Sequence, residues 1–163
     1  MKEQRHKLGH TLTIMYLSWF GAGRAKKAPG TFGTLAALPF IYAWSLLAPP
    51  EWLSVTLLTV MTVLACVLAD KTQREEKVSD PQWIVVDEVI GMAITWFVAG
   101  PQNFFWWALA FAAFRFFDIV KFWPASYFDQ QVKNGWGTIL DDVVSGVYAG
   151  IFVKLASYFF YRS

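Results

Sequence analysis

Hydrophobic residues stand in long runs along this chain, and most of the charged residues fall between the runs. Most runs have about 18 residues, roughly the length that a helix needs to cross the hydrocarbon layer of a membrane. The runs cover residues 31–48, 52–69, 84–99, 104–120 and about 143–161. This pattern predicts an all-α fold, a polytopic membrane helix bundle with about five spans that forms one domain over residues 1–163.

The connections between the runs are of two kinds. Residues 49–51 alone separate the first two runs and residues 100–103 alone separate the third and fourth, which predicts two antiparallel hairpins. The other connections are long and charged. Residues 1–18 form a tail that is predicted to be mobile or interfacial, and the segment 12–20 is a candidate interfacial or re-entrant helix.

Positive charge is distributed unevenly among these connections. Of the 14 Lys and Arg residues, six precede the first run, three lie in residues 71–77, and two, Lys121 and Lys133, lie in the loop before the last run. The short hairpins hold none. The positive-inside rule therefore predicts that the N-terminus and both long loops are cytoplasmic. The composition, 56% hydrophobic and 16% charged, also suits lipid better than water.

The most informative charges are acidic residues at the ends of apolar runs. Asp87 and Glu88 open the third run, Asp118 closes the fourth, and Asp141 and Asp142 open the fifth. The predicted topology places all five on the cytoplasmic side. Acids at the rim of a membrane span cost several kcal/mol unless they are paired, face water or bind a cation. A shared Mg²⁺ site would account for them, because Mg²⁺ takes carboxylate oxygens and water.

A structural role is the alternative for most of these acids. Acidic residues near a helix N-terminus are favoured by the helix dipole, but Asp118 lies at a helix C-terminus, where the dipole disfavours negative charge. Arg115 and Lys121 lie three residues to either side of Asp118, so the three form one charged stripe on a helix face. This stripe is either a structural ion triad or a pair of bases directed at a phosphate.

Two glycine-containing segments have a similar ambiguity. Gly30 and Thr31 lie at the start of the first run, where backbone amides favour anions, and Lys26 and Lys27 come just before them. The alternative is a plain turn with ordinary positive-inside charges. Residues 134–142, NGWGTILDD, are likewise either a binding loop or a turn.

Some chemistry is disfavoured by what the chain lacks. Its two histidines, His6 and His10, both lie in the N-terminal tail, and its one cysteine, Cys66, lies within an apolar run. Phosphohistidine chemistry, a cysteine nucleophile and a disulfide within one chain are therefore not expected. An aspartate nucleophile or a metal-activated water remains, and we favour the water.

Five sequence blocks, in one order, resemble the phosphatidylglycerophosphatase A family of bacterial membrane phosphatases. The blocks are PGTFGTLAALP at 29–39, VDEVIGM at 86–92, FRFFDIVKFWP at 114–124, FD at 128–129 and GWGTILDDVVSG at 135–146. The resemblance covers residues 19–146. Phe122 replaces a proline that is frequent in the family, and Ser145 replaces an alanine, but neither position carries the proposed chemistry.

The resemblance implies Mg²⁺-dependent hydrolysis of the terminal phosphate monoester of phosphatidylglycerophosphate, which gives phosphatidylglycerol and inorganic phosphate. It also implies a multi-pass protein of the bacterial inner membrane, with its active site facing the cytoplasm. The expected partner is a phospholipid substrate in the bilayer and no nucleic acid, and the oligomeric state stays open.

We therefore expect three groups of site residues. They are the metal ligands Asp87, Glu88, Asp141 and Asp142; a further ligand or base, Asp118 or Asp129; and the phosphate-binding residues Arg115, Lys121, Gly30, Thr31, Lys26 and Lys27. Two other classes compete with a phosphatase. One is another membrane lipid-phosphate enzyme, such as a CDP-alcohol phosphotransferase, whose aspartate spacing is absent here. The other is a cation transporter, which needs polar residues at mid-membrane depth.

Overall fold

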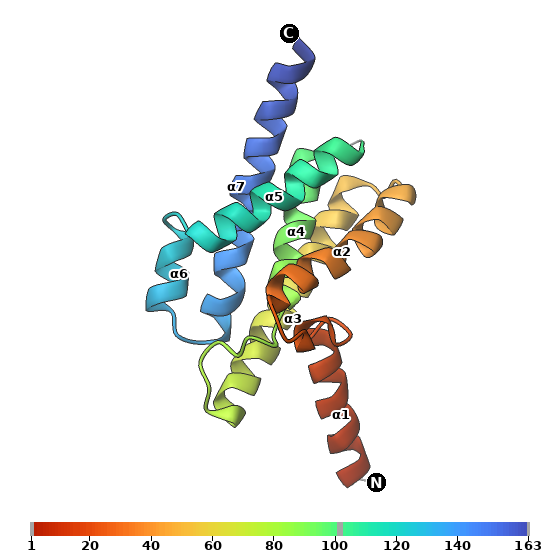
Figure 1. Ribbon diagram of the computed structural model, residues 1–163. Coiled ribbons are helices and arrows are strands. Elements are labelled where there is room, and N and C mark those ends of the chain that lie inside the picture. The colour runs from red at the N-terminus through yellow and green to blue at the C-terminus, as the bar shows by residue number, and fades with distance from the viewer. Residues whose placement is uncertain (1, 101–102, 163) are drawn as a thin grey trace.

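The computed structural model describes residues 2–100 and 103–162, with side chains from residue 7 onward, and the regular secondary structure of this part is all helix. Figure 1 shows the arrangement. The elements are α1 (Lys2–Leu17), η1 (Ala22–Arg24), α2 (Pro29–Leu46), α3 (Glu51–Glu76), α4 (Val86–Ala99), α5 (Phe104–Val120), α6 (Ala125–Gln131) and α7 (Gly135–Arg162). The predicted all-α class is confirmed.

Each of the five apolar runs forms a helix, namely α2, α3, α4, α5 and α7. The helix α3 continues beyond its apolar run to Glu76, and an ion pair of 2.7 Å between Asp70 and Arg74 lies in this charged extension. Short connections join α2 to α3 and α4 to α5, as predicted. Residues 101–102 of the second connection lie outside the described part.

The start of α7 differs from the prediction. The helix begins at Gly135, and the Asn134 Oδ1 atom accepts hydrogen bonds from the backbone N–H groups of Trp136 (3.0 Å) and Gly137 (3.2 Å). The glycine-containing segment is therefore a capped first helical turn. The prediction that Asp141 and Asp142 open this helix is wrong, because they lie about two turns inside it, where the N-terminal dipole no longer accounts for them.

The N-terminal tail is helical from Lys2 to Leu17. This helix extends from the end of the molecule opposite to the C-terminus (Figure 1), and the Tyr16 hydroxyl donates a hydrogen bond of 2.7 Å to the Met61 carbonyl of α3. His10 is exposed, whereas the side chain of His6 lies outside the described part. The interfacial or mobile character of the tail stays a prediction.

Two helices of the described chain, α3 and α7, are long and apolar enough to cross a membrane. In their most apolar stretches only 22% and 28% of the residues are buried, so both helices turn most of their apolar surface outward. A core helix of a soluble protein would be mostly buried. These two helices indicate a membrane protein, and the count of about five spans stays a prediction.

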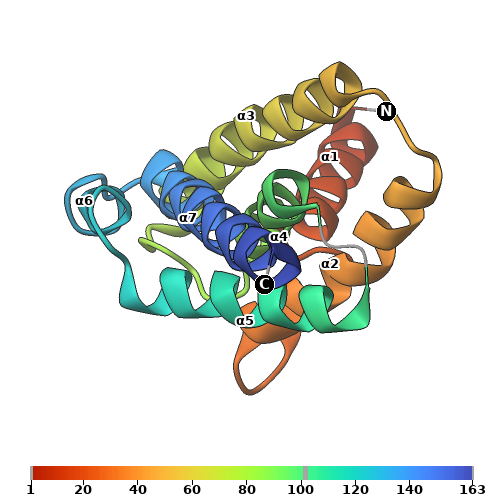
Figure 2. The same cartoon turned by 90° about the horizontal axis from the view of Figure 1, so that it is seen from above.

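The helix α7 runs through the molecule and packs against α3, α4, α5 and α6 (Figures 1 and 2). Its closest approach to α4 is at Gly146 and Gly91, where a Cβ atom on Gly146 would overlap the Gly91 carbonyl. The Thr95 hydroxyl lies 2.9 Å from the Gly91 carbonyl and 3.1 Å from that of Gly146. Small residues permit such close contact between membrane helices.

This crossing positions the acids. Gly91 follows Asp87 by one helical turn on α4, and Gly146 follows Asp142 by one turn on α7. Side chains one turn apart lie on the same helix face. The close contact of the two glycines therefore brings the acidic turns of both helices together.

We predict that Gly146→Ala lowers the free energy of unfolding by about 1–3 kcal/mol, because the added methyl group would overlap backbone rather than a movable side chain. Unfolding in detergent, followed by heat or denaturant, measures the change. Gly9→Ala is the matched control, since a Cβ at this helical position meets no atom within 4 Å. Equal stability of the two variants would contradict a close crossing.

Candidate active site

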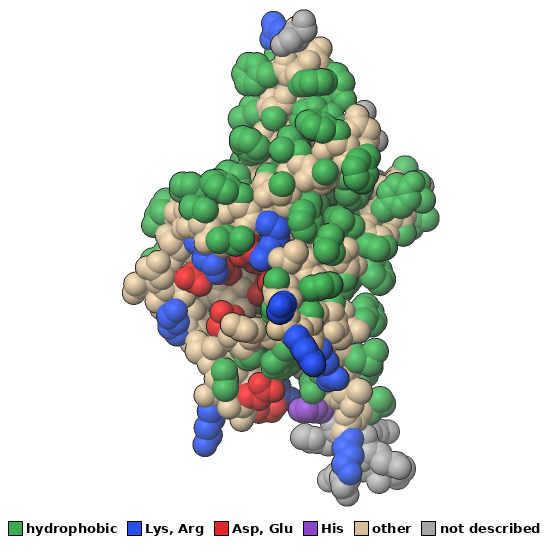
Figure 3. Space-filling model, in the orientation of Figure 1, with side chains coloured by type: hydrophobic (Ala, Val, Ile, Leu, Met, Phe, Trp, Pro, Cys, Tyr) green, Lys and Arg blue, Asp and Glu red, His purple; other side chains and the backbone are tan. Residues whose placement is uncertain are grey.

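One cavity of about 420 Å³ collects the predicted acids. Its walls come from the starts of α2 and α4, the end of α5, α6, the first turns of α7 and the loop before α4. Figure 3 shows acidic and basic side chains gathered in a hollow, with hydrophobic side chains above it. The charged lining residues are Asp80, Asp87, Glu88, Arg115, Asp118, Lys121, Asp129, Lys133, Asp141 and Asp142.

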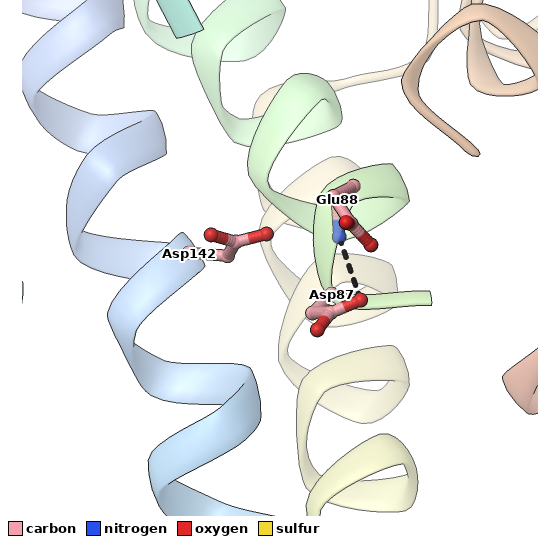
Figure 4. A group of neighbouring side chains, drawn as sticks. All are labelled: Asp87, Glu88 and Asp142. Carbon is pink, nitrogen blue, oxygen red and sulfur yellow. Dashed lines mark hydrogen bonds between the residues drawn. The ribbon is translucent and has the colours of Figure 1, made fainter. Parts of the chain in front are cut away.

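Three of the carboxylates meet across the crossing of α4 and α7. One oxygen from each of Asp87, Glu88 and Asp142 lies within 4.8 Å of the others, and Figure 4 shows Asp142 facing the two acids of α4. Asp87 and Asp142 are buried, and the Glu88 Oε2 atom is buried without a hydrogen-bond partner. Buried like charges are costly unless protons or a nearby cation neutralise them. The three oxygen ligands therefore fit a divalent cation such as Mg²⁺.

The start of α2 closes over this group of acids. A Cβ atom on Gly30 would overlap the Glu88 Oε1 atom and lie 3.2 Å from an Arg115 terminal nitrogen. The first turn of α2 therefore comes close to both of these side chains. The positive end of a helix dipole thus lines the cavity, an arrangement that favours anions.

Arg115 is held among the acids but retains an unused donor. One terminal nitrogen lies 2.6 Å from the Asp118 carboxylate and 3.9 Å from that of Glu88. The Nε atom of Arg115 is buried without a hydrogen-bond partner. Because an unpartnered buried donor is costly, this atom favours an incoming acceptor such as a phosphate oxygen.

Lys121 lies between two acids of different helices. Its ammonium group contacts Asp129 of α6 at 2.9 Å and forms an ion pair with the Oδ2 atom of Asp141 of α7. Burial acts to lower the pKa of Lys121, but the charges and hydrogen bonds of these two acids outweigh it and raise that pKa above its ordinary value. The other Asp141 oxygen accepts a hydrogen bond of 2.9 Å from the Asp142 amide.

The structure thus separates the four predicted metal ligands. Asp87, Glu88 and Asp142 bring oxygens together, whereas both oxygens of Asp141 already have partners. The predicted stripe also divides, because Arg115 pairs with Asp118 while Lys121 turns to other helices.

Three predicted phosphate-binding residues do not line the cavity. Lys26 and Lys27 are exposed in the segment before α2, and Thr31 lies within the first turn of that helix. Ala28 occupies the N-cap position of α2. Of this segment only Gly30 among the predicted residues reaches the site.

Sequence reasoning missed several cavity residues. They are Ser79, Asp80, Gln82, Lys133 and Thr138. The first three come from the loop before α4, and their position directly upstream of the VDEV block was the one available signal. Lys133 Nζ donates a hydrogen bond of 2.7 Å to the backbone carbonyl of Asp129, a contact that no sequence pattern indicates.

The fold and the cavity define a class, that of helical membrane proteins with an acid-rich cavity that an arginine and a lysine also line. The family model for phosphatidylglycerophosphatase A matches residues 15–157. The chain therefore belongs to the phosphatidylglycerophosphatase A family, a family of phosphatases.

Individual relatives agree with this assignment. A phosphatidylglycerophosphatase A of Haemophilus influenzae is 39% identical, over 85% of this chain and 85% of its own length. One of Escherichia coli is 38% identical, over 81% of this chain and 76% of its own. A protein of Bacteroides thetaiotaomicron named putative phosphatidylinositol-3-phosphatase is 35% identical, over 89% and 93%. No solved structure matches the chain.

We predict that Lys121→Met lowers the free energy of unfolding by about 3–5 kcal/mol, because it leaves the Asp141 carboxylate, only 3% exposed, without its cation. Adding Asp141→Asn should restore more than half of the loss. Unfolding of the single and double variants in detergent measures the coupling.

The matched control is Lys133→Met. The Lys133 side chain is exposed and its ammonium group contacts a backbone carbonyl, so its loss should change stability little. Purely additive effects of Lys121→Met and Asp141→Asn would contradict the ion pair.

Proposed function

We propose that this protein hydrolyses the terminal phosphate monoester of phosphatidylglycerophosphate in an Mg²⁺-dependent reaction. The products are phosphatidylglycerol and inorganic phosphate. The observation that supports this most is the meeting of three carboxylate oxygens beside a partly buried arginine in one cavity. Two relatives that are 38% and 39% identical carry the name of this activity.

In this proposal Asp87, Glu88 and Asp142 hold the metal. When bound, Mg²⁺ supplies positive charge beside the phosphoryl oxygens and makes a neighbouring water more acidic. Arg115 uses its unpartnered Nε atom to bind the phosphate and to offset the negative charge that develops on it. Gly30 and the start of α2 add a favourable dipole.

A carboxylate near the metal group takes the proton of the attacking water. The oxygen of this water bonds to phosphorus, and the bond from phosphorus to the glycerol oxygen breaks. The glycerol oxygen takes a proton from solvent, to which the carboxylate returns the proton that it accepted. We favour Asp118 over Asp129 as the base, because one Arg115 nitrogen contacts both Asp118 and Glu88. Asp129 instead forms an ion pair with Lys121, and the same ammonium group also pairs with Asp141.

We further propose that about five helices cross a bacterial inner membrane and that the cavity lies at its cytoplasmic face. The distribution of Lys and Arg residues supports this orientation, because they gather in the N-terminal segment and the two long connections. A lipid phosphate at headgroup level would then meet the acids without leaving the bilayer.

We predict that purified protein releases inorganic phosphate from phosphatidylglycerophosphate in mixed micelles only with Mg²⁺, and that excess chelator stops the release. Phosphatidylinositol 3-phosphate is the comparison substrate, since one relative is named for it. Faster release from that lipid would contradict the proposed substrate while leaving a lipid phosphatase. Release that persists after thorough chelation would contradict the metal site.

We also predict that Asp87→Asn and Asp142→Asn each lower turnover on the order of 100-fold or more, because each removes a charged ligand from the metal group. Phosphate release and Mg²⁺ affinity, read by calorimetry, are measured together. Asp70→Asn is the control, since Asp70 pairs with Arg74 outside the acid cavity. Full activity in both site variants would refute the assignment.

A further inference from the structure

A second cavity, of about 250 Å³, lies between α2, α3 and α4, with Trp19 also in its wall. We call it the apolar groove. Ser54 is the one hydroxyl-bearing residue of its lining, and this hydroxyl accepts a hydrogen bond of 3.0 Å from the Trp44 indole nitrogen. The remaining lining is hydrophobic, so the groove suits a hydrocarbon ligand and not the phosphate that the acid cavity would take.

The apolar groove and the acid cavity lie on opposite sides of α4. Asp87 and Glu88 line the cavity, whereas Val89, Ala93 and Trp96 line the groove. At about 100° per residue, the two sets point in opposite directions from the helix axis. The helices α5, α6 and α7 contribute to the cavity only, and α3 contributes to the groove only. Because α4 separates the two sites, we assign the groove to a lipid other than the substrate.

The opening of the groove faces the surface that lipid covers. The helices α2 and α3 diverge from their connection (Figure 2), and α3 is a candidate span with most of its apolar surface turned outward. Phe40 of α2 is 53% exposed and Leu57 of α3 is 38% exposed at the groove. The groove thus continues the hydrocarbon-facing surface of α3, where acyl chains are the surrounding medium.

We propose that the apolar groove binds one acyl chain of a bilayer glycerophospholipid that is not the substrate. Along α2 the lining extends from Ala37 to Trp44, so the groove is roughly 10 Å long in the direction of the helix axis. The same helix carries Gly30 against Glu88 at its start. A bound chain therefore supports the helix whose first turn closes the acid cavity.

The test uses the full chain in phosphatidylcholine vesicles that contain a phosphatidylcholine with a diazirine in mid-chain. Illumination with chelator present and substrate absent makes the result independent of catalysis. Labelled residues are mapped by mass spectrometry of peptides. We expect Leu57, Leu58 and Met61 of the groove to be labelled several-fold more than the exposed Val60 and Val63 of the same helix.

Two variants fill the groove from different helices, Ala93→Phe from α4 and Leu57→Trp from α3. Each should reduce the labelling of Leu58 and Met61 several-fold, and the second variant keeps the test decisive where the first one fails to fold. Ala108→Phe is the matched control, because Ala108 is exposed on α5 outside the groove.

Three results would overturn the proposal. Equal labelling of groove and outward-facing residues would mean that the groove takes no particular chain. Unchanged labelling in both filled variants would mean the same. Cross-links between two copies of the chain through groove residues, with no lipid label there, would identify a second protein copy as the occupant. A loss of phosphatase activity with unchanged labelling of the groove would contradict the proposed function of the acid cavity and not the binding of an acyl chain.

Discussion

The contact of Gly91 with Gly146 is the constraint on which the rest of the site depends. Acids repel one another, and here two helices that carry them pack with so little space that a single Cβ atom would not fit between them. The contact lies one turn beyond the acids on each helix, so packing of glycines offsets repulsion of carboxylates. The same spacing, Asp-x-x-x-Gly, occurs on both helices, at 87–91 and 142–146. Each of these two segments therefore supplies both an acid of the cavity and a glycine of the helix contact.

Compensation of charge is divided between two bases with distinct surroundings. Arg115 lies beside Asp118 and Glu88 with a donor unused, and Lys121 is held by acids from α6 and α7. An arginine with an open donor suits a ligand that comes and goes, whereas a doubly paired lysine suits a fixed joint between helices. The acid cavity therefore contains one group prepared for an anion and one that holds its walls.

Much of the fold followed from the sequence, because apolar runs of membrane length define helices almost by themselves. The gathering of acids also followed, since charge asymmetry fixes which helix ends share a side. The start of α7 did not, because Asn134 and two glycines are as typical of a turn as of a capped helix. Nor could the sequence separate Asp141 from Asp142. Adjacent residues on a helix point about 100° apart, and only the packed structure decides which one meets Lys121. The sequence could not predict the apolar groove either. Within an apolar run, hydrophobic residues that line a groove look the same as those that face lipid or the core.

The shortness of α4 has a consequence for how the site is enclosed. With 14 residues the helix is about 21 Å long, well below the roughly 30 Å of a typical hydrocarbon layer. Its neighbour α3, with 26 residues, is longer than that layer is thick. None of the 14 residues of α4 is exposed, so the surrounding helices and not lipid enclose it. The thickness of a membrane therefore places no demand on the length of this inner helix, and its acidic first turn can lie deeper than the ends of its longer neighbours.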